Sequence, residues 1–393
     1  MIQCALPPRE HVGSKTGCRL ERHTLPTARG PITERLFEMF RHAPGESRFR
    51  LDDLRTELTS DDLQLALYCC YELHYQGLPG VDDGWEWEPS VLALSSQLAG
   101  LFEAQIRTEL PRSKTDVDEV AGALWDMTRS AGGSSLSRWV TDHGTMFHAR
   151  ELAVHRSGYQ LKEADPHTWA IPRLHGRAKA AMVAIQNDEY GNGTVAEMHS
   201  SLFADTVASL DLDSSYGFYV DLLPAVTLAT TNLISMFGLQ RRLRGALVGH
   251  LAAFEMNSVA PMRRYSAWLE SLGVSEGGRR FYDVHVDADR IHQYIAVDDL
   301  VGGFLESEPS QASEVLFGAR ALGLVEASFT EHVLGAWSRG KSSLRHAGTD
   351  ELAPTALSAK RSKCQIVRES SSQEHPQGLV VQPHECSPRM GST

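Results

Sequence analysis

The sequence contains few cysteines, and none of them forms a Cys-x-x-Cys pair. The adjacent Cys69 and Cys70 would point in different directions on a helix. The other four lie near the ends of the chain, at Cys4, Cys18, Cys364 and Cys386. This usage argues against a thiolate zinc site and against a disulfide framework, and we expect a reducing, cytoplasmic location.

Long apolar segments are also scarce. The first residues, MIQCALPPREHVGSKTGCR, lack the apolar core that a secretory signal needs. The longest uncharged run, Leu222 to Gln240, has about the length of a membrane span but includes Pro224 and Asn232. We therefore expect a buried helix in this segment and no membrane partner.

Basic residues are outnumbered by acidic ones, and the formal net charge is −12. Residues 1–30 carry five basic and two acidic side chains, and residues 345–393 carry six basic and five acidic ones, so residues 31–344 hold −16. Because phosphate binding needs a basic surface, this body argues against nucleic acid as the main partner. The acid excess serves either solvation or metal binding.

No alternation of apolar and polar residues lasts long enough to predict a β-sheet. The pattern is helical instead, as in LTSDDLQLALYCCYELHYQG, where Thr59 or Ser60 is the N-cap and Gly77 ends the helix. We predict an all-α fold with a disordered tail at residues 1–30, one helical domain at residues 31–344 and a second disordered tail at residues 345–393. Further helices are predicted after Ser90 and over residues 116–129, 137–164, 172–190, 194–209, 218–238, 240–272, 277–306 and 310–337.

His285, Asp289 and His292 form the clearest local pattern, because steps of four and three residues place all three on one face of a helix. Two imidazoles and a carboxylate are suitable ligands for iron, zinc or manganese. Asp287 and Arg290 populate the same helix. The pattern alone therefore suits a metal site and a polar surface stripe about equally.

Four more residues are candidates for the same site. Glu163 and Glu189 end predicted helices, and His199 follows the break at Gly191-Asn192-Gly193. On a continuous helix Glu189 and His199 would lie about 15 Å apart, so the break must fold His199 back if both belong to one centre. Glu255 lies in an apolar helical context, where it needs either a metal or an arginine partner such as Arg263 or Arg264.

The seven residues balance two ferrous ions in charge. Glu163, Glu189, Glu255 and Asp289 contribute −4, the two ions contribute +4, and the imidazoles stay neutral. A buried centre can then reduce O2 without a large change in net charge, which a dry interior would resist. A lone zinc ion would need only three or four of these ligands.

The same residues resemble the haem-oxygenase-like diiron oxidases and oxygenases. The segment His285-x-x-x-Asp289-x-x-His292 follows Glu163, Glu189, His199 and Glu255, which are separated by 26, 10 and 56 residues. The stretches YQLKEADPHTWAIPRL, DEYGNG and MHSSLF, with YELHYQG and WEWEP nearer the start, are similar to an actinobacterial branch described as iron-containing redox enzymes. The resemblance covers roughly residues 24–340.

This resemblance implies a haem-oxygenase-like bundle of about seven core helices plus accessory N-terminal helices. It implies a non-haem diiron centre with two Fe(II)/Fe(III) ions, O2 as co-substrate and a peroxo-diferric intermediate. Glu163, Glu189 and Glu255 would then be terminal or bridging ligands, Asp289 the helix carboxylate, and His199, His285 and His292 the nitrogen ligands. Family members oxidise small molecules of amine, amino-acid or fatty-acid type, so we expect a small-molecule oxygenase or oxidase of specialised metabolite biosynthesis.

Other interpretations stay open. A ferritin-like centre would need a Glu-x-x-His motif on each of two helices, which the body lacks. The alternatives are a haem-binding or cofactor-free enzyme on the same fold and a non-catalytic helical binding protein. The chain has no flavin or iron–sulfur motif, so we consider an external electron donor, and we also consider a homodimer.

Several further residues resemble site residues more weakly. Glu72 and His74 are two positions apart and do not share a helix face. The resemblance makes them, together with Glu86, packing or substrate-channel features. Arg173 and His175 follow a predicted helix start and could hold a substrate carboxylate.

Overall fold

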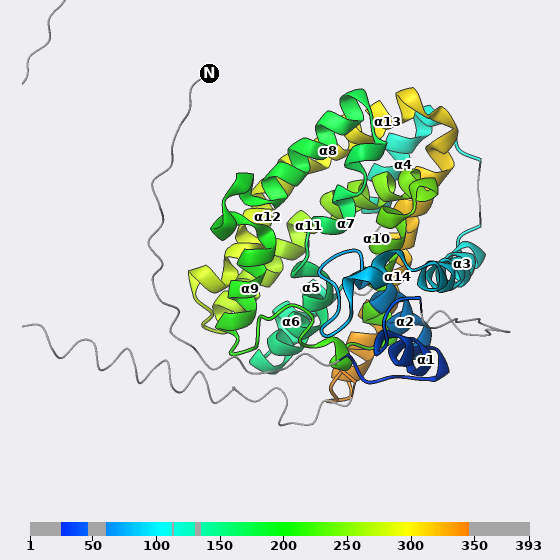
Figure 1. Ribbon diagram of the computed structural model, residues 1–393. Coiled ribbons are helices and arrows are strands. Elements are labelled where there is room, and N and C mark those ends of the chain that lie inside the picture. Colours follow the sequence, from blue (N-terminus) through cyan, green and yellow to red (C-terminus); the bar gives the residue numbers. More distant parts are fainter. Residues whose placement is uncertain (1–24, 46–59, 112–113, 130–134, 346–393) are drawn as a thin grey trace, which may run out of the picture. The chain divides into compact units, whose positions relative to one another are not determined.

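Helices account for all regular secondary structure in the part of the chain that the structure describes (Figure 1). The structure is a computed structural model, and it describes residues 25–45, 60–111, 114–129 and 135–345. The predicted all-α fold is confirmed. No helix within these ranges is long and apolar enough to cross a membrane.

The helices follow one another with short 3-10 turns between them, and a π-helical segment, Ile295–Val301, continues the helix before it. The bounds are α1 (Pro31–Phe40), α2 (Asp61–Glu72), α3 (Pro89–Glu109), α4 (Val117–Arg129), α5 (Leu136–His143), α6 (Met146–Gln160), α7 (Asp165–Thr168), α8 (Gly176–Glu189), α9 (His199–Ser209), α10 (Ala225–Leu239), α11 (Arg244–Ser271), α12 (Glu276–Tyr294), α13 (Gly302–Ser307) and α14 (Ala312–Trp337). The apolar run at residues 222–240 is a buried helix, α10, as the sequence predicts.

α11 forms the centre of the core, where it packs against both α12 and α14. Its contact with α14 depends on two glycines. A Cβ at Gly249 would lie 1.8 Å from the carbonyl oxygen of Val315, and a Cβ at Gly318 would lie 1.9 Å from that of Ala246. Since neither distance is sterically allowed, only glycine lets these two backbones approach so closely.

Several helix boundaries differ from the prediction, and the helices predicted from residues 194 and 218 begin at His199 and Ala225. Two further differences reflect packing between distant segments. The helix predicted over residues 137–164 is divided into α5 and α6 at Gly144, whose backbone is extended. A Cβ there would lie 2.3 Å from Trp268 Nε1 of α11. The helix predicted from residue 172 begins at Gly176, after a 3-10 turn whose Arg173 donates to the carbonyl oxygens of Gly238 and Leu239.

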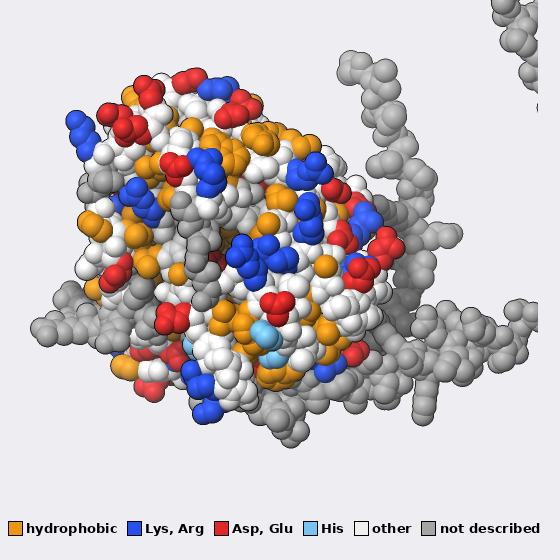
Figure 2. Space-filling model, turned by 180° about the vertical axis from the view of Figure 1, so that it is seen from behind, with side chains coloured by type: hydrophobic (Ala, Val, Ile, Leu, Met, Phe, Trp, Pro, Cys, Tyr) orange, Lys and Arg blue, Asp and Glu red, His pale blue; other side chains and the backbone are white. Residues whose placement is uncertain are grey.

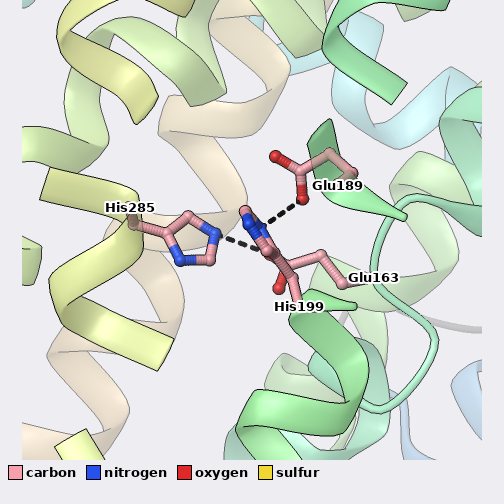
Figure 3. A group of neighbouring side chains, drawn as sticks. All are labelled: Glu163, Glu189, His199 and His285. Carbon is pink, nitrogen blue, oxygen red and sulfur yellow. Dashed lines mark ion pairs between the residues drawn. The ribbon is translucent and has the colours of Figure 1, made fainter. Parts of the chain in front are cut away.

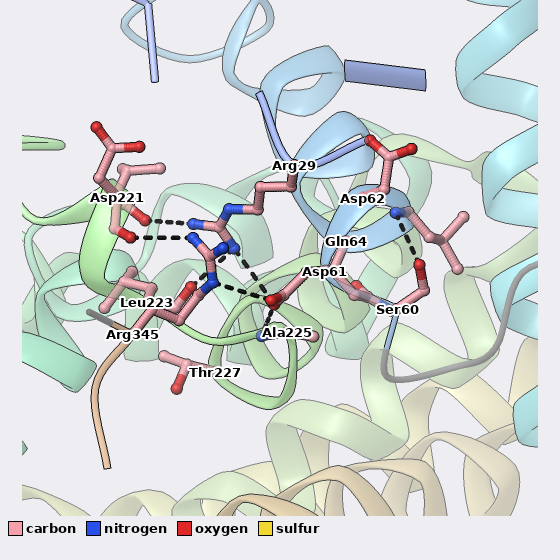
Figure 4. A network of polar contacts seen from close by, with 12 residues as sticks. Arg29, Ser60, Asp61, Asp62, Gln64, Asp221, Leu223, Ala225, Thr227 and Arg345 are labelled. Carbon is pink, nitrogen blue, oxygen red and sulfur yellow. Dashed lines mark hydrogen bonds and ion pairs between the residues drawn. The ribbon is translucent and has the colours of Figure 1, made fainter. Parts of the chain in front are cut away.

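Arg29 and Arg345, near the two ends of the described residues, contact the same part of the body (Figure 4). Arg29 donates to the carbonyl oxygens of Val220 at 2.7 Å and Leu223 at 2.8 Å. Arg345 Nε lies 2.9 Å from Asp61 Oδ2, and Arg29 Nη1 lies 3.6 Å from Asp61 Oδ1. Asp61, the first residue of α2, therefore forms ion pairs with both arginines.

This network includes residues just outside the predicted helical domain. Residues 25–30 and Arg345, which the sequence analysis assigned to the tails, contact the helical body. The rest of the two predicted tails, residues 1–24 and 346–393, lies outside the described residues.

Charged side chains of both signs are interspersed with hydrophobic ones on the face shown in Figure 2. Part of the acid excess lies inside the body instead. Glu163, Glu189, Glu255 and Asp289 are between 1% and 8% exposed. Four buried carboxylates need a compensating partner, because an unpaired charge in the interior is costly.

Candidate metal centre

The seven residues that the sequence singled out lie together in the interior. Glu163 lies in the turn between α6 and α7, Glu189 is the last residue of α8, and His199 is the first residue of α9. α11 contributes one carboxylate, and α12 contributes the three residues of its predicted face. These are Glu255, His285, Asp289 and His292.

The turn after α8 explains how Glu189 and His199 meet. Gly191, Asn192 and Gly193 have φ values of 60°, 52° and 80°, in the left-handed region that favours glycine and asparagine. A Cβ at Gly191 would lie 2.4 Å from the carbonyl carbon of Glu197, so the returning chain passes directly over this glycine. The turn folds His199 back as predicted, and its Nδ1 lies 2.8 Å from Glu189 Oε2.

The first of two clusters consists of Glu163, Glu189, His199 and His285 (Figure 3). One ligand atom from each lies within 4.8 Å of the others. His285 Nε2 is 3.8 Å from Glu163 Oε1 across this space. Two carboxylates and two imidazoles form a donor set that suits iron, manganese or zinc.

The second cluster consists of Glu189, Glu255, Asp289 and His292, with ligand atoms again within 4.8 Å of one another. His292 Nδ1 is 3.4 Å from Glu255 Oε2 and 3.7 Å from Asp289 Oδ1. Glu255 thus faces a histidine rather than an arginine. Glu189 belongs to both clusters, so the two donor sets share this carboxylate.

Two histidines are oriented by hydrogen-bond acceptors outside the clusters. The carbonyl oxygen of Phe281 lies 2.6 Å from His285 Nδ1, and Asp188 Oδ2 lies 3.0 Å from His292 Nε2. Each acceptor can take a ring N–H, and a metal ion in the cluster would then bind the other nitrogen, which faces it. The sequence analysis did not assign Asp188; its position next to Glu189 was the available signal.

Several carboxylate oxygens have no hydrogen-bond donor among the described residues. They include both oxygens of Glu163 and Oδ1 of Asp289. Such atoms are expensive to bury, at about 1–3 kcal/mol for a neutral group and more for a charged one. Metal ions between the carboxylates would satisfy these atoms, and the oxygen and nitrogen donors of the two clusters are of a kind that iron accepts.

The pKa shifts follow from burial and from repulsion between the carboxylates. Burial and then Glu189 raise the pKa of Glu163 well above its usual range, and burial and Asp289 do the same for Glu255. Burial lowers the pKa of His292, but the carboxylates of Asp289 and Glu255, which lie 3.7 Å and 3.4 Å from its Nδ1, outweigh this and raise it to about 11. Strongly shifted groups gathered in one place are characteristic of functional sites.

The residue after Glu163 has a strained backbone. Ala164 has φ 77° and ψ −36°, which costs a non-glycine residue about 1–3 kcal/mol. Its carbonyl oxygen accepts hydrogen bonds from the backbone N–H of Thr168 and from Gln186 Nε2, both at 3.0 Å. These bonds hold the turn and thereby position Glu163.

A buried ion pair anchors the same turn from the other side. Lys162 Nζ contacts Glu72 Oε1, and the Tyr216 hydroxyl donates to Glu72 Oε2 at 2.5 Å. Both charged side chains are 1% exposed. Glu72 therefore holds the Glu163 turn against α2, which is a packing role of the kind the resemblance suggests.

The other candidates lie outside the clusters. His74 Nδ1 is 3.3 Å from Glu86 Oε1. The guanidinium of Arg173 donates to the carbonyl oxygens of Gly238 and Leu239 at the end of α10. Arg173 is therefore not placed to hold a substrate carboxylate, which corrects the expectation from the sequence. Cys69 and Cys70 are buried, and burial raises the pKa of Cys70 to about 12, as in an unreactive thiol.

A small cavity of about 10 Å³, roughly the room for one water molecule, lies against both clusters. Besides the ligand residues it is lined by Tyr159, His167, Gln186, Leu251 and Phe254, with Ala164 at the turn. Most of the residues that line it are polar or charged, as expected of the space between candidate metal ligands. The sequence analysis missed Gln186, although it lies one helical turn before Glu189.

An all-helical body with buried carboxylates and histidines in two clusters is characteristic of metalloproteins built on helical bundles. Residues 150–326 match the model of a family described as iron-containing redox enzyme. This match includes all seven candidate ligands and confirms the predicted resemblance, and with the all-helical body it supports the haem-oxygenase-like fold.

One curated relative is similar over part of the chain. A nitrosourea synthase from Streptomyces achromogenes subsp. streptozoticus is 25% identical over 147 residues. The similar segment covers 37% of this chain and 31% of that protein. Since less than a third of the relative is covered, its activity does not transfer directly to this chain.

Proposed function

We propose that this protein is a non-haem diiron oxidoreductase that uses O2 to oxidise a small molecule in specialised metabolite biosynthesis. The family match supports an iron redox enzyme, and the similarity to an enzyme named nitrosourea synthase supports a role in specialised metabolism. An external protein or small molecule would return the irons to the ferrous state.

The observation that carries the proposal is the pair of clusters with Glu189 in common. Four carboxylates balance two ferrous ions, whereas a single ion would leave about half of these buried groups unpaired. The ligand atoms are oxygen and nitrogen only, which suits iron.

The chain's own residues determine how such a centre would work. When bound, two ferrous ions would supply electrons for the reduction of O2. Phe281 and Asp188 hold His285 and His292 in the tautomer that leaves the ligand nitrogen free. Leu251 and Phe254 give the cavity apolar walls, which limit the access of water to the reacting atoms.

Anaerobic reconstitution with Fe(II) tests this proposal. We expect about two irons per chain by metal analysis, and a transient visible absorbance with O2 consumption when O2 is added. Removing a ligand from α12, as in His285→Ala or Asp289→Ala, should reduce iron uptake and O2 consumption.

The control variant is Asp287→Ala, on the exposed face of the same helix. It should bind iron as the unchanged protein does. No iron uptake, or equal uptake by Asp289→Ala and Asp287→Ala, would contradict the proposal. Iron bound as haem would instead favour a haem enzyme on the same fold.

A further inference from the structure

His167 and His250 form a buried pair next to the cavity. His167 lies on α7 and lines the cavity, and His250 lies on α11 one turn before Phe254, which is another lining residue. His167 Nε2 is 3.2 Å from His250 Nδ1, and both residues are 2% exposed. In this hydrogen bond one ring donates an N–H and the other accepts it, so a proton can pass from ring to ring.

Each ring keeps a second nitrogen that the pair does not use. For His167 this is Nδ1, and the cavity that His167 lines has room for about one water molecule. For His250 it is Nε2, and the charge of Glu326 on α14 acts on this ring, because it raises the pKa of His250 against the larger effect of burial. The Glu326 side chain is 30% exposed and is paired with Arg156 at 2.7 Å. The pair therefore connects the cavity with a carboxylate that reaches solvent.

The histidines among the candidate ligands cannot make this connection. His292 reaches the partly exposed Asp188 through Nε2, but its Nδ1 faces Glu255 and would hold a metal ion. His285 Nδ1 lies against the carbonyl oxygen of Phe281, which accepts a proton in a hydrogen bond but has none to give. Of the two histidines that line the cavity among the described residues, only His167 is not a candidate ligand.

Aromatic rings surround the pair and keep it uncharged. The ring of His250 stacks on Phe254 at 6.1 Å between centroids, and Phe237 lies 6.1 Å away on its edge. Burial lowers the pKa of His167 well below its usual range and that of His250 to about 4. At neutral pH the pair therefore adds no charge beside the clusters, although each ring can still take a proton on one nitrogen while releasing one from the other.

The proposed reaction consumes protons in this enclosed space. Without a substrate, O2 takes two electrons from two ferrous ions together with two protons, and the products are hydrogen peroxide and two ferric ions. When one oxygen atom is inserted into a substrate, the other leaves as water and again takes two protons. Protons must therefore reach the cavity through the protein or with water.

We propose that His167 and His250 are a proton relay that supplies the reduction of O2 at the two clusters from the side of Glu326. For each proton that His167 releases from Nδ1 into the cavity, His250 passes its Nδ1 proton to His167 Nε2 and takes up one proton on Nε2. Rotation of both rings restores the starting tautomers. This inference rests on the proposed function, since it describes how protons enter the same reaction.

The variant His250→Gln tests the relay, because an amide can still bond to His167 but cannot pass a proton between two ring nitrogens. His155→Gln is the matched control, since His155 is equally buried and does not line the cavity. Protein loaded with Fe(II) is mixed with O2 in a stopped-flow instrument, without a substrate, and released hydrogen peroxide is assayed. We expect both variants to bind iron and to form the visible absorbance at the rate of the unchanged protein, because electron transfer to O2 needs no proton. Its decay and the release of peroxide should be about 100-fold slower in His250→Gln only.

Chemical rescue separates a relay from a packing role. His250→Gly leaves space for the lost ring, and small molecules can bind in such a space. The isomers 4-methylimidazole and 1-methylimidazole have equal size, but only the first has both an N–H and a free ring nitrogen. Isothermal titration calorimetry on the iron-free variant first measures whether each isomer binds. Bound 4-methylimidazole should speed the decay about tenfold or more, and bound 1-methylimidazole should not.

A measurement on iron-free protein tests the pair without any turnover. Nitrogen NMR of protein labelled in its histidines should show one proton between His167 Nε2 and His250 Nδ1. This shared proton should be missing from His250→Gln and present in His155→Gln.

Each outcome decides the inference. Equal decay rates in His250→Gln and His155→Gln, equal effects of the two bound isomers, or protons on both facing nitrogens would overturn it. If His250→Gly does not fold or binds neither isomer, the two glutamine variants decide alone. The proposed function fails separately, as absent iron uptake or absent O2 consumption in the unchanged protein.

Discussion

Asp188 is 48% exposed at its side chain, yet it accepts the N–H of His292, which is 2% exposed. One surface carboxylate therefore sets the tautomer of a buried candidate ligand. Such acceptors raise the basicity of the histidine and hold its ring in place. The second cluster consequently depends on a residue that lies outside it.

Replacement of Asp188 should weaken iron binding. We expect Asp188→Ala to lower the affinity for Fe(II) by about 10- to 100-fold, because His292 would lose the acceptor that orients it. Asp188→Asn should lose less, since its amide oxygen still accepts. Titration against a competing chelator measures the affinity.

The neighbouring Asn187→Ala serves as the control, because Asn187 is exposed and contacts Asn192 rather than a histidine. Its affinity should equal that of the unchanged protein. If Asp188→Ala bound iron equally well, the orienting role of Asp188 would be wrong.

Close backbone contacts, as well as apolar faces, determine which helices pack against each other in this fold. The α11–α14 contact depends on Gly249 and Gly318, and the division between α5 and α6 depends on Gly144 against Trp268. Each of these glycines meets a residue far away in the sequence. Helical periodicity predicts which segments are helices, but it does not contain these contacts, and the break at Gly144 was therefore missed.

Two alanine substitutions in α14 should have opposite effects on stability. Gly318→Ala would place a methyl group against the backbone of α11, which we expect to lower the free energy of unfolding by about 1–3 kcal/mol or more. Gly323→Ala, where a Cβ meets nothing within 4 Å, should raise it by about 0.5–1 kcal/mol through helix propensity. Urea unfolding followed by circular dichroism measures both, and equal effects would contradict this account of the interface.

Buried histidines make the stability of the whole molecule sensitive to acid. Burial lowers the pKa values of His155, His167 and His250, that of His250 to about 4. His155 is 1% exposed and lies between Thr227 Oγ1 at 2.8 Å and Ser343 Oγ at 2.9 Å. Below the ordinary histidine pKa of about 6.5, these histidines bind protons in the unfolded chain but stay neutral in the folded protein. The free energy of unfolding therefore falls as the pH falls.

The variant His155→Gln tests this dependence. It should be less stable than the unchanged protein at neutral pH, because packing and hydrogen bonds are lost. The difference in free energy of unfolding between the two proteins should become smaller by roughly 1.4 kcal/mol from about pH 7.5 to pH 5.5. Only the unchanged protein loses stability through His155 over this pH range. Urea unfolding at both pH values measures it.

The exposed His143→Gln is the control for the substitution itself. A constant difference for His155→Gln would show that His155 can be protonated in the folded state. The pH effect would then have to come from other groups.

The sequence by itself determined the features that depend on residues near one another. Helical periodicity predicts the all-α fold, and the spacing of His285, Asp289 and His292 predicts one helix face. The break at Gly191–Gly193 allows the return of His199, which a single centre would require. These are local because the backbone conformation of a short segment decides them. The wider ligand set came from a resemblance to a family, not from spacing.

Only the tertiary structure decided which distant groups meet. It showed that Glu189 belongs to both clusters, that Asp188 orients His292, and that His167 and His250 meet beside the cavity. It also showed that Arg29 and Arg345 belong to the body rather than to the tails. A side chain's hydrogen-bond partner depends on which elements pack around it, and that information is not contained in any single segment of the chain.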